Sequence, residues 1–387
     1  MTATRAYLDY NASAPLLASA REAMVAALDM SANPSSVHAE GRAARRLIEN
    51  ARRDVAALVN AKPEHVVFTS GATEAASTLL TPDWRMGRGA LRMSRLYVCE
   101  ADHPCILNGG RFPAALVTRI GVNANGLLDL GALAAALAAH DKAEGLPLVA
   151  VHAGNNETGV VQPVDRIAEI VKAAGGILIL DAVQAAGRIH IDMSAGYGDF
   201  LILSSHKIGG PKGVGAIVAL SDLMMPKPLI NGGGQEKGHR GGTENLAGIA
   251  GFGAAAREAL AGLKDIDSVR HRRDKIEAIV KTLVPDAEIF GTGATRLANT
   301  TFFAIAGVKA ETAQIAFDLA GVALSAGSAC SSGKVGPSHV LKAMGHGDSL
   351  GALRVSIGAA TSAADIALFR ATLAGIASRR ATREQAA

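Results

Sequence analysis

The sequence predicts an α/β fold in which helices flank a central, mainly parallel sheet, with a smaller α+β domain beside it. Aliphatic runs recur along the chain, and each is followed by polar or glycine-rich residues and then by an alanine-rich helical stretch. This alternation is typical of parallel strands joined by helical crossovers. The composition agrees: 49% of the 387 residues are hydrophobic, only 4% are aromatic and 43 are glycine, which favours an aliphatic core with tight turns.

Five aliphatic runs supply the expected strands of the large sheet. With the residues that follow them, they are HVVFTSGATEA, RLYVCEADHP, PLVAVHAGNNETG, GILILDAVQAAG and DFLILSSHKIGG. Continuous apolar segments such as 177–180 and 200–203 are typical of strands buried on both faces. Ligands of open α/β sheets lie beyond the carboxyl ends of the strands. The residues expected there are Thr73, His103, Asn156, Asp181, Gln184, His206 and Lys207.

A change of pattern near residue 257 predicts a domain boundary. Residues 257–283 have the pattern of a long, charged, amphipathic helix, unlike the glycine-punctuated region before them. We expect a large domain over residues 14–257 and a small domain formed by residues 1–13 and 258–387. Strands are expected in the small domain at 299–305 and 353–357, whereas the sequence gives no clear path for residues 76–93.

Charge and cysteine content narrow the class of protein. There are 39 Lys and Arg against 35 Asp and Glu, a net charge of +4, and no basic cluster with interleaved aromatic residues, which argues against nucleic-acid binding. Three cysteines are too few for a disulfide framework. No segment resembles a signal peptide or approaches the roughly 20 apolar residues that span a bilayer. We therefore expect a cytoplasmic protein that contacts neither nucleic acid nor membrane.

Lys207 lies directly after an expected strand, in the glycine-rich turn SSHKIGGPKG. A lysine amine condenses with aldehyde cofactors, and partial burial favours its neutral, nucleophilic form. A solitary lysine in a turn is more often a solvated surface residue. The interpretation of Lys207 therefore depends on its neighbours.

Two neighbouring features favour a cofactor-binding role for Lys207 over a solvated surface lysine. Asp181 ends the strand GILIL, where a buried carboxylate is costly unless it is paired, for example with a protonated pyridine nitrogen; a helix cap is the alternative. SGATEA, which contains Thr73, opens a helix whose backbone N–H groups would accept a phosphate, although it also reads as an ordinary capping box. Lysine, acid and phosphate cradle together are what a pyridoxal-phosphate site requires.

These features belong to an ordered set of motifs that resembles the class-V aminotransferase family, and in particular its cysteine desulfurases. The motifs are YLDYNASAP, NPSSVHAEGR, TSGATEA, EADH, NNETGVVQP, DAVQAAG, SSHKIGGPKG, GGGQEKGHRGGTEN, SAGSACSSG and LRVSIG. SAGSACSSG is the most diagnostic, because related transaminases lack this cysteine-bearing loop. The resemblance implies fold type I of the pyridoxal-phosphate enzymes and a homodimer with shared sites.

The resemblance also implies roles for individual residues. Lys207 would bind the cofactor aldehyde, Asp181 would pair with the pyridine nitrogen, and His103 would stack on the ring and transfer protons. Arg354 would clamp the substrate carboxylate with its two-donor fork. Gln184 and Asn156 would approach the ring oxygen. The expected phosphate ligands are Ala72, Thr73, Ser204 and His206, with Thr243 reaching the phosphate of the neighbouring subunit.

Cys330 lies among glycine and serine residues in SAGSACSSG. Such a polar loop is poor for burial and well suited to carrying a thiol between a site and an outside acceptor, although free cysteine is usually a buried hydrophobe. The resemblance implies that L-cysteine is converted to L-alanine and that Cys330 holds the sulfur as a persulfide. An iron–sulfur scaffold or another acceptor protein would then take the sulfur.

Several alternatives stay open. A selenocysteine lyase or another class-V enzyme would share these motifs, and a non-catalytic sulfur-relay scaffold would use Cys330 but would not need Lys207. Cys99, His103 and Cys105 form C-x3-H-x-C, but a fourth ligand is missing and the spacing is unusual. We expect no stable metal site, only a transient contact of Cys330 with a nascent iron–sulfur cluster. His38 and Arg240 match family motifs without an assigned role.

Overall fold

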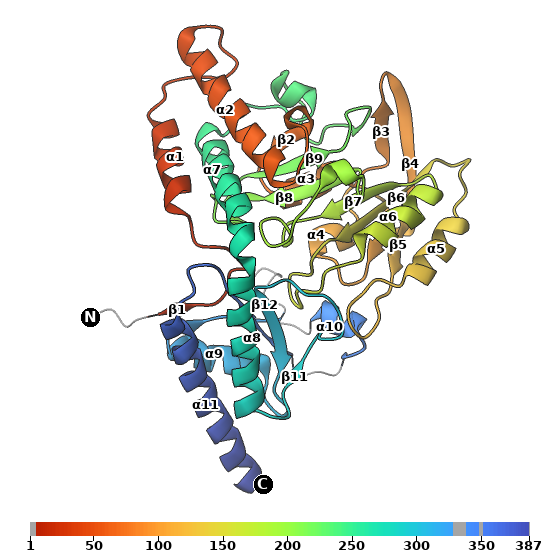
Figure 1. Ribbon diagram of the computed structural model, residues 1–387. Helices are drawn as coiled ribbons and strands as arrows, with labels where there is room; N and C mark the ends of the chain where they lie inside the picture. Colours follow the sequence, from red (N-terminus) through yellow and green to blue (C-terminus); the bar gives the residue numbers. More distant parts are fainter. Residues whose placement is uncertain (1–4, 328–337, 348–350, 387) are drawn as a thin grey trace.

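The structure is a computed structural model that describes residues 5–327, 338–347 and 351–386. Figure 1 shows two bodies, an upper one built around a nine-stranded sheet and a lower one built around a four-stranded sheet, called the large sheet and the small sheet below. Cys330 lies outside the described residues.

The large sheet has a parallel centre with antiparallel margins. Strands β5, β4, β6, β7 and β8 are neighbours in that order and all run parallel. Strand β9 is antiparallel to both β8 and β2, so β2 runs in the direction of the central strands. The α/β fold with a mainly parallel sheet is therefore confirmed. The strand bounds are β2 (Val66–Thr69), β3 (Asp83–Met86), β4 (Gly89–Cys99), β5 (Val117–Ile120), β6 (Leu146–His152), β7 (Ile177–Asp181), β8 (Phe200–Ser204), β9 (Gly215–Ala219) and β10 (Met224–Pro226).

Both faces of the large sheet are buried, which explains the continuous apolar runs. In β6, Val149 and Val151 belong to one hydrophobic cluster, whereas Leu148 and Ala150 belong to another, as the alternation of side chains along a strand requires. The first cluster is covered by α2 (Ala39–Leu58), α5 (Leu130–Ala138), α6 (Val164–Ala173) and α7 (Leu246–Gly262), and the second by α3 (Ala72–Leu79) and α4 (Pro104–Leu107). Helix α1 (Ala18–Leu28) packs on α7.

Residues 76–93 form the end of α3 and then a β-hairpin. Strand β3 pairs antiparallel with the first part of β4, with Met86 opposite Gly89, so that the turn consists of two residues. Gly87 at this turn has φ +55°, a value that glycine adopts at little cost. The segment whose path the sequence does not predict is thus an extension of the sheet beyond its parallel centre.

The small sheet has its own hydrophobic cluster, in which Phe303, Phe317 and Phe369 are fully buried. The expected strands at 299–305 and 353–357 correspond to β12 (Thr300–Ala304) and β15 (Leu353–Ser356), which pair antiparallel. The other elements of this body are β11 (Glu288–Ile289), β14 (Ser325–Ala326), α8 (Ile266–Leu283), α9 (Ala310–Leu319) and α11 (Ala363–Ala386), with β1 (Ala6–Tyr7) pairing with β13 (Val322–Ala323) beside them.

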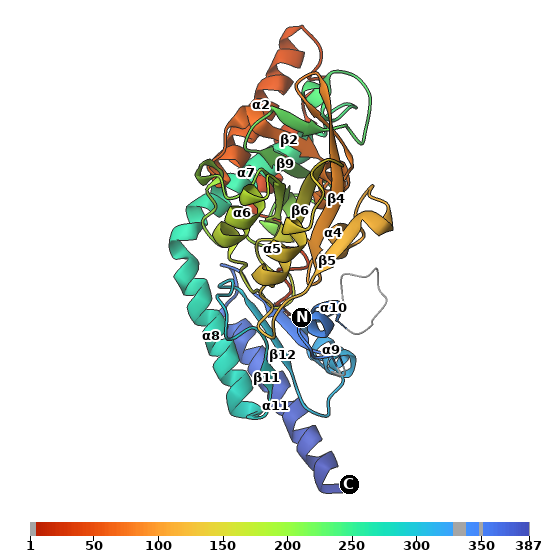
Figure 2. The same cartoon turned by 90° about the vertical axis from the view of Figure 1, so that its right-hand side faces the viewer.

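A helical run connects the two bodies. Helix α7 continues through a short 3-10 turn, Leu263–Asp265, into α8, and in Figure 2 the run passes down one side of both bodies. The boundary expected after residue 257 falls inside α7, and the division into two domains stays a prediction. The run Leu246–Leu283 has the length and composition of a membrane-spanning helix, but its α7 part packs against α1 and α2 within the fold.

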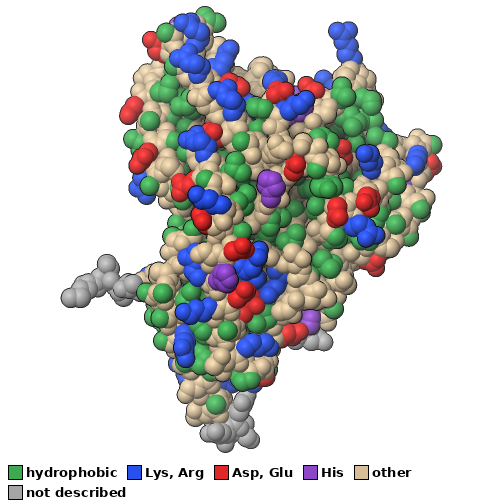
Figure 3. All heavy atoms as spheres, in the orientation of Figure 1, with side chains coloured by type: hydrophobic (Ala, Val, Ile, Leu, Met, Phe, Trp, Pro, Cys, Tyr) green, Lys and Arg blue, Asp and Glu red, His purple; other side chains and the backbone are tan. Residues whose placement is uncertain are grey.

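Charged side chains are distributed over the surface without an extended patch of one sign on the face shown in Figure 3. Acidic and basic side chains are interspersed there over both bodies. The described part of this face therefore offers no long basic stripe of the kind that follows a nucleic-acid backbone.

The ion pair between Arg52 and Glu236 is buried and predicts a measurable stability effect. Both nitrogens of the Arg52 fork contact the Glu236 carboxylate, at 2.7 and 2.8 Å, and this carboxylate also accepts the Phe68 N–H at 2.8 Å. In Glu236→Ala, Arg52 would lose its buried partner and keep only the half-exposed Glu49 carboxylate, which lies 3.2 Å from its Nε. We expect urea unfolding to show a loss of about 3–5 kcal/mol.

The exposed pair of Arg166 and Glu169 on α6 provides the control, since their side chains are 64% and 74% exposed. Glu169→Ala should change the free energy of unfolding by less than about 1 kcal/mol. An equal decrease in the free energy of unfolding in Glu169→Ala and Glu236→Ala would contradict the prediction.

Candidate active site

A cavity of about 470 Å³ lies at the carboxyl ends of the parallel strands. The residues that line it come from the turns after β2, β4, β6, β7 and β8 and from the N-terminal segment. The predicted site residues among them are Ala72, Thr73, His103, Asn156, Asp181, Gln184, Ser204, His206 and Lys207. The structure thus brings together residues that are up to 135 positions apart in the chain.

Lys207 occupies a one-turn 3-10 helix, Ser205–Lys207, that follows β8 directly. Two glycines allow the chain to turn sharply after it. Gly209 has φ +86°, and a Cβ there would lie 2.6 Å from Leu17 Cγ, while a Cβ on Gly210 would overlap the hydroxyl of Ser205. The two glycines of the sequence SSHKIGG are therefore required by close packing under the lysine.

The amine of Lys207 reaches the N-terminal segment. Its Nζ donates to the backbone carbonyls of Asn11 and Ala12, at 2.6 and 3.0 Å. The Asn11 carbonyl also accepts a hydrogen bond from Gln184 Nε2, at 3.0 Å. Asn11 is itself tied to the small sheet, because its side-chain amide donates to Thr300 Oγ1 at 2.9 Å. Lys207 is thus held at the junction of the two bodies.

Asp181 places a buried carboxylate at the end of β7. The pKa of Asp181 is raised from 3.8 to about 6, mainly by burial and also by the charge of Asp102, whereas the Val183 N–H, His152 and Lys207 act in the opposite direction. Oδ1 of Asp181 accepts the N–H of Val183 at 3.0 Å. Within the described residues Oδ2 has no hydrogen-bond partner, so this oxygen is left for a cationic N–H donor in the cavity.

His152 supports Asp181 from the neighbouring strand. The two residues are directly opposite each other in the β6–β7 ladder, and His152 Nδ1 lies 2.6 Å from Asp102 Oδ1. The amide of Gln162 donates to Gly126 O and accepts from Leu128 N, so its Nε2 must donate to His152 Nε2, at 3.0 Å. The ring proton of His152 therefore lies on Nδ1 and points at Asp102.

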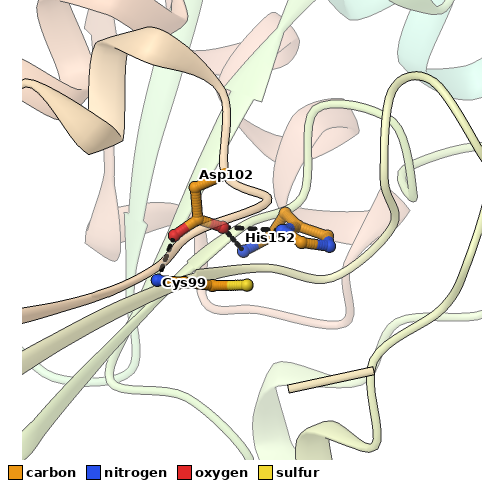
Figure 4. A group of neighbouring side chains, drawn as sticks. All are labelled: Cys99, Asp102 and His152. Atoms are coloured by element: carbon orange, nitrogen blue, oxygen red, sulfur yellow. Dashed lines mark hydrogen bonds and ion pairs between the residues drawn. The ribbon is translucent and has the colours of Figure 1, made fainter. Parts of the chain in front are cut away.

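The side chains of Cys99, Asp102 and His152 lie close enough to hold a metal ion, and Figure 4 shows how they are used instead. Oδ2 of Asp102 accepts the Cys99 N–H at 2.8 Å, and Oδ1 accepts both the N–H and the Nδ1–H of His152. Burial raises the pKa of the Cys99 thiol well above 9.0. Because the carboxylate is occupied by donors and the thiol stays protonated, this cluster is a hydrogen-bonded support, not a ligand set.

His103 lines the cavity together with Cys105. Its Nδ1 accepts the backbone N–H of Cys105 at 3.2 Å and lies 3.1 Å from Cys105 Sγ, so the proton of the neutral ring lies on Nε2. Burial, with the charges of Lys207 and His339, lowers the pKa of His103 from 6.5 to about 4. The imidazole is consequently neutral near pH 7 and can donate a proton from Nε2. The motif C-x3-H-x-C does not converge on one point, because Cys99 belongs to the Asp102 cluster.

The start of α3 forms one wall of the cavity. Gly71, Ala72 and Thr73 line it, and the first N–H groups of a helix have no acceptor within the helix. Ser204 and His206 face the same space. Burial, with the charges of Lys207 and Lys212, lowers the pKa of His206 to about 4. The cavity thus offers helix-start N–H groups without an acceptor in the helix, together with Lys212, a combination that suits a phosphate group.

Arg354 lies beyond the lining of the cavity. Its Nη1 donates to Asn156 O at 3.0 Å, and its Nη2 donates to Asp9 Oδ1 at 2.8 Å and to Ser325 Oγ at 3.1 Å. The side chain is 2% exposed, and Nε is buried without a hydrogen-bond partner. The fork expected to clamp a carboxylate is therefore bound to Asp9 and Ser325, and the role of Arg354 stays a prediction.

Thr243, Arg240 and His38 lie outside this cavity. Thr243 lines a second cavity of about 260 Å³, which shares Ser70, Gly213 and Val214 with the first. Arg240 Nε lies 3.1 Å from Glu74 Oε1, which ties its loop to α3. His38 caps α2 by accepting the Gly41 N–H at 3.3 Å. Arg240 and His38 thus have structural contacts that the motifs alone do not reveal.

Sequence reasoning missed Asn11, Asp102 and His152. A signal was present for each: Asn11 lies in YLDYNASAP, Asp102 precedes His103 in EADH, and His152 ends an apolar run in the same way as Asp181. The site therefore contains a nucleophilic amine, a buried acid with a free oxygen and an anion-binding helix start within one cavity. These are donor and acceptor types that fit an aldehyde cofactor with a pyridine ring and a phosphate.

Comparisons with known proteins agree with this geometry. A family model described as Aminotransferase class-V matches residues 6–369. A cysteine desulfurase from Cereibacter sphaeroides is 39% identical over 378 residues, 94% of this chain and 93% of the relative. One from Frankia sp. (strain EuIK1) is 40% identical over 379 residues, with coverages of 93% and 88%.

Solved structures give the same result. A NifS-like protein from Rickettsia africae has a TM-score of 0.85 at 30% identity, covering 96% of this chain and 99% of the other. A second NifS-like protein has a TM-score of 0.84 at 27% identity, with coverages of 97% and 100%. By the extent of the family match and the identity of these relatives, the chain belongs to the class-V aminotransferase family and, within it, to the cysteine desulfurases.

Proposed function

We propose that this enzyme uses pyridoxal phosphate to convert L-cysteine to L-alanine and that Cys330 takes up the sulfur as a persulfide. The observation that supports the proposal most directly is that Lys207, Asp181 and the first turn of α3 line one cavity. When bound, pyridoxal phosphate supplies an aldehyde that accepts amines and a protonated ring that accepts the electrons released when the α-proton leaves.

The chain offers a partner for each part of the cofactor. Lys207 would bind the aldehyde, Oδ2 of Asp181 would accept the pyridine N–H, and the phosphate would lie against the N–H groups of Ala72 and Thr73. Asp181 has the environment that this role requires, because a cation beside it relieves the cost of burying its charge. Ser204, His206 and Lys212 would complete the phosphate site, with Thr243 serving the site of the partner subunit.

The remaining side chains would act on the substrate. Lys207, once released by the incoming amine, would accept the α-proton, and neutral His103 would donate from Nε2 to a leaving or returning group. Arg354 would hold the substrate carboxylate. Cys330, as a thiolate, would form a bond to the substrate sulfur while the Cβ–S bond breaks, and a proton would then be added to the three-carbon product.

We further propose that the enzyme is a cytoplasmic homodimer that passes its sulfur to an iron–sulfur scaffold or another acceptor protein. Exposed apolar side chains of α1 and of the segment before α2 support the dimer, because Val25, Leu28 and Val37 are 54%, 71% and 86% exposed. Large apolar groups that gather on a surface favour association. The thiol of Cys330 would be the point of transfer to the acceptor.

The reaction is tested by measuring products from L-cysteine with and without Cys330. The cofactor-loaded protein should form alanine and sulfide in equal amounts when a reductant is present, and the Cys330-containing peptide should gain one sulfur when it is absent. Cys330→Ala should bind L-cysteine but turn it over at below about 1% of the normal rate, because the acceptor thiol is missing. Cys99→Ala, which changes only a core thiol, is the control, and normal turnover by Cys330→Ala would exclude the mechanism.

Cofactor attachment is tested by borohydride reduction of the loaded protein. The cofactor mass should be fixed on the peptide that contains Lys207, and Lys207→Ala should lose this labelling, since the amine that adds to the aldehyde is absent. Lys212→Ala removes a second lysine of the same cavity and should keep the labelling on Lys207. Labelling of Lys207→Ala at an unchanged level would show that another amine holds the cofactor.

The raised pKa of Asp181 predicts a pH-dependent stability of the cofactor-free protein. Its pKa rises from 3.8 to about 6 on folding, so the folded state binds this proton more tightly than the unfolded state does. Stability is therefore lost as pH rises from about 4 to 6, by about 3 kcal/mol in total. Asp181→Asn should not lose stability over this pH range. Its free energy of unfolding should equal that of the parent below pH 4 and exceed it above pH 6.

The same variant should bind the cofactor more weakly, by about 10- to 100-fold, because an amide cannot balance the charge of the ring nitrogen. Urea unfolding at a series of pH values and equilibrium dialysis with pyridoxal phosphate measure the two effects. A stability difference that is the same at pH 4 and pH 8 would rule out the assigned origin of the pKa shift.

A further inference from the structure

Arg188 lies in the turn after β7 as a buried cation, and its hydrogen bonds within the described residues are all to neutral oxygens. Its side chain is 8% exposed. Nη1 donates to the backbone carbonyl of Gln184 at 2.9 Å and to the side-chain Oε1 of the same residue, and Nη2 donates to Lys207 O at 3.3 Å. Among the described residues no carboxylate lies within ion-pair distance of it. A buried charge without a counter-ion is costly, so its presence here calls for a physical role.

The contacts of Arg188 fix the orientation of the Gln184 amide. Oε1 of Gln184 faces the guanidinium, and Nε2 donates to the Asn11 carbonyl at 3.0 Å. An amide nitrogen carries two protons, and Gln184 lines the cavity. The second N–H is used by neither of these two contacts. If the amide rotated by half a turn, its oxygen would face Asn11 O and its NH₂ group would face the cation, an arrangement with two repulsive contacts.

Arg188 also acts on the strength of this donor. A positive charge on the carbonyl side of an amide draws electron density toward the oxygen and makes the N–H groups stronger donors. In the described ranges of the chain the guanidinium has no carboxylate partner that would cancel this effect, and burial keeps the local dielectric constant low. Arg188 additionally holds the carbonyl of Lys207, so it contacts two residues that the proposed function assigns to the cofactor.

We propose that Arg188 is a positioning residue that acts through Gln184, whose amide N–H it directs at the ring oxygen of pyridoxal phosphate. The inference rests on the proposed function, because it requires that the cofactor bind with its ring oxygen on the side of Gln184. It goes beyond that function in assigning the affinity for the ring oxygen to a residue outside the cavity lining.

The test is a double-mutant cycle on cofactor affinity, measured by equilibrium dialysis and by the visible absorbance of the bound cofactor, without any turnover. Arg188→Met and Gln184→Ala should each weaken the binding of pyridoxal phosphate by about 10- to 100-fold, the range for one hydrogen bond to a charged group. In the Gln184→Ala background, Arg188→Met should add less than about threefold, because its effect passes through the missing amide.

A cofactor analogue with hydrogen in place of the ring hydroxyl gives a second readout. The parent protein and Arg188→Met should bind this analogue with affinities within about threefold of each other, since the group that Gln184 contacts is absent. A merely structural role for Arg188 would weaken the binding of both ligands alike. The inference would be overturned if Arg188→Met lost affinity equally for pyridoxal phosphate and for the analogue. It would also be overturned if the affinity losses of Arg188→Met and Gln184→Ala were additive in the double variant.

Arg111 supplies a matched control. Like Arg188, it donates to three neutral oxygens, here the backbone carbonyls of Ser77, Thr78 and Lys227, but it does not line the cavity or contact Gln184. Arg111→Met should leave cofactor affinity within about twofold of the parent. If Arg188→Met does not fold, Arg188→Lys, which cannot reach all three oxygens together, enters the same cycle under the same criteria. Failure of the parent protein to bind pyridoxal phosphate would instead refute the proposed function.

Discussion

The buried carboxylate of Asp181 is the feature on which the organisation of the site depends. A charge at the inner end of β7 would be unstable without nearby groups of opposite sign, and burial indeed raises its pKa to about 6. His152 lies opposite it on β6, with its ring held by Asp102 and Gln162, and the positive charge of Lys207 comes from the turn after β8. A cation in the cavity would complete the balance, which is why we propose that the pyridine nitrogen lies at this position.

The second constraint is that Asn11 connects the large-sheet body to the small-sheet body. Its backbone carbonyl accepts hydrogen bonds from Lys207 and Gln184, while its side chain bonds to Thr300 and Asn299 near the small sheet. The site is therefore not a property of the large sheet alone. A shift of the small sheet would move the acceptors of Lys207, so the position of the amine depends on the packing of both bodies.

Much of the site followed from the periodicity of the sequence. Asp181 comes directly after a continuous apolar run, and Thr73 and Lys207 follow such runs within a few residues; parallel strands bring such positions to one edge of a sheet. The same rule applies to His152, which was nevertheless missed because a single histidine after an apolar run also fits a buried core position. Arg354 is a case in which the sequence pattern does not predict the contacts of the side chain. Its side chain contacts Asp9, 345 positions away, and no local pattern predicts that its fork is already occupied.

The sequence by itself thus determined the parallel α/β sheet, the edge at which the functional residues gather and the family motifs that identify the chemistry. Only the tertiary structure decided the hairpin at β3 and β4, the tautomer of His152, the direction of the Gln184 amide and the contacts of Arg188. The reason is physical. Strand burial is encoded in the order of apolar residues, whereas the direction of a hydrogen bond depends on which distant groups the fold packs around it.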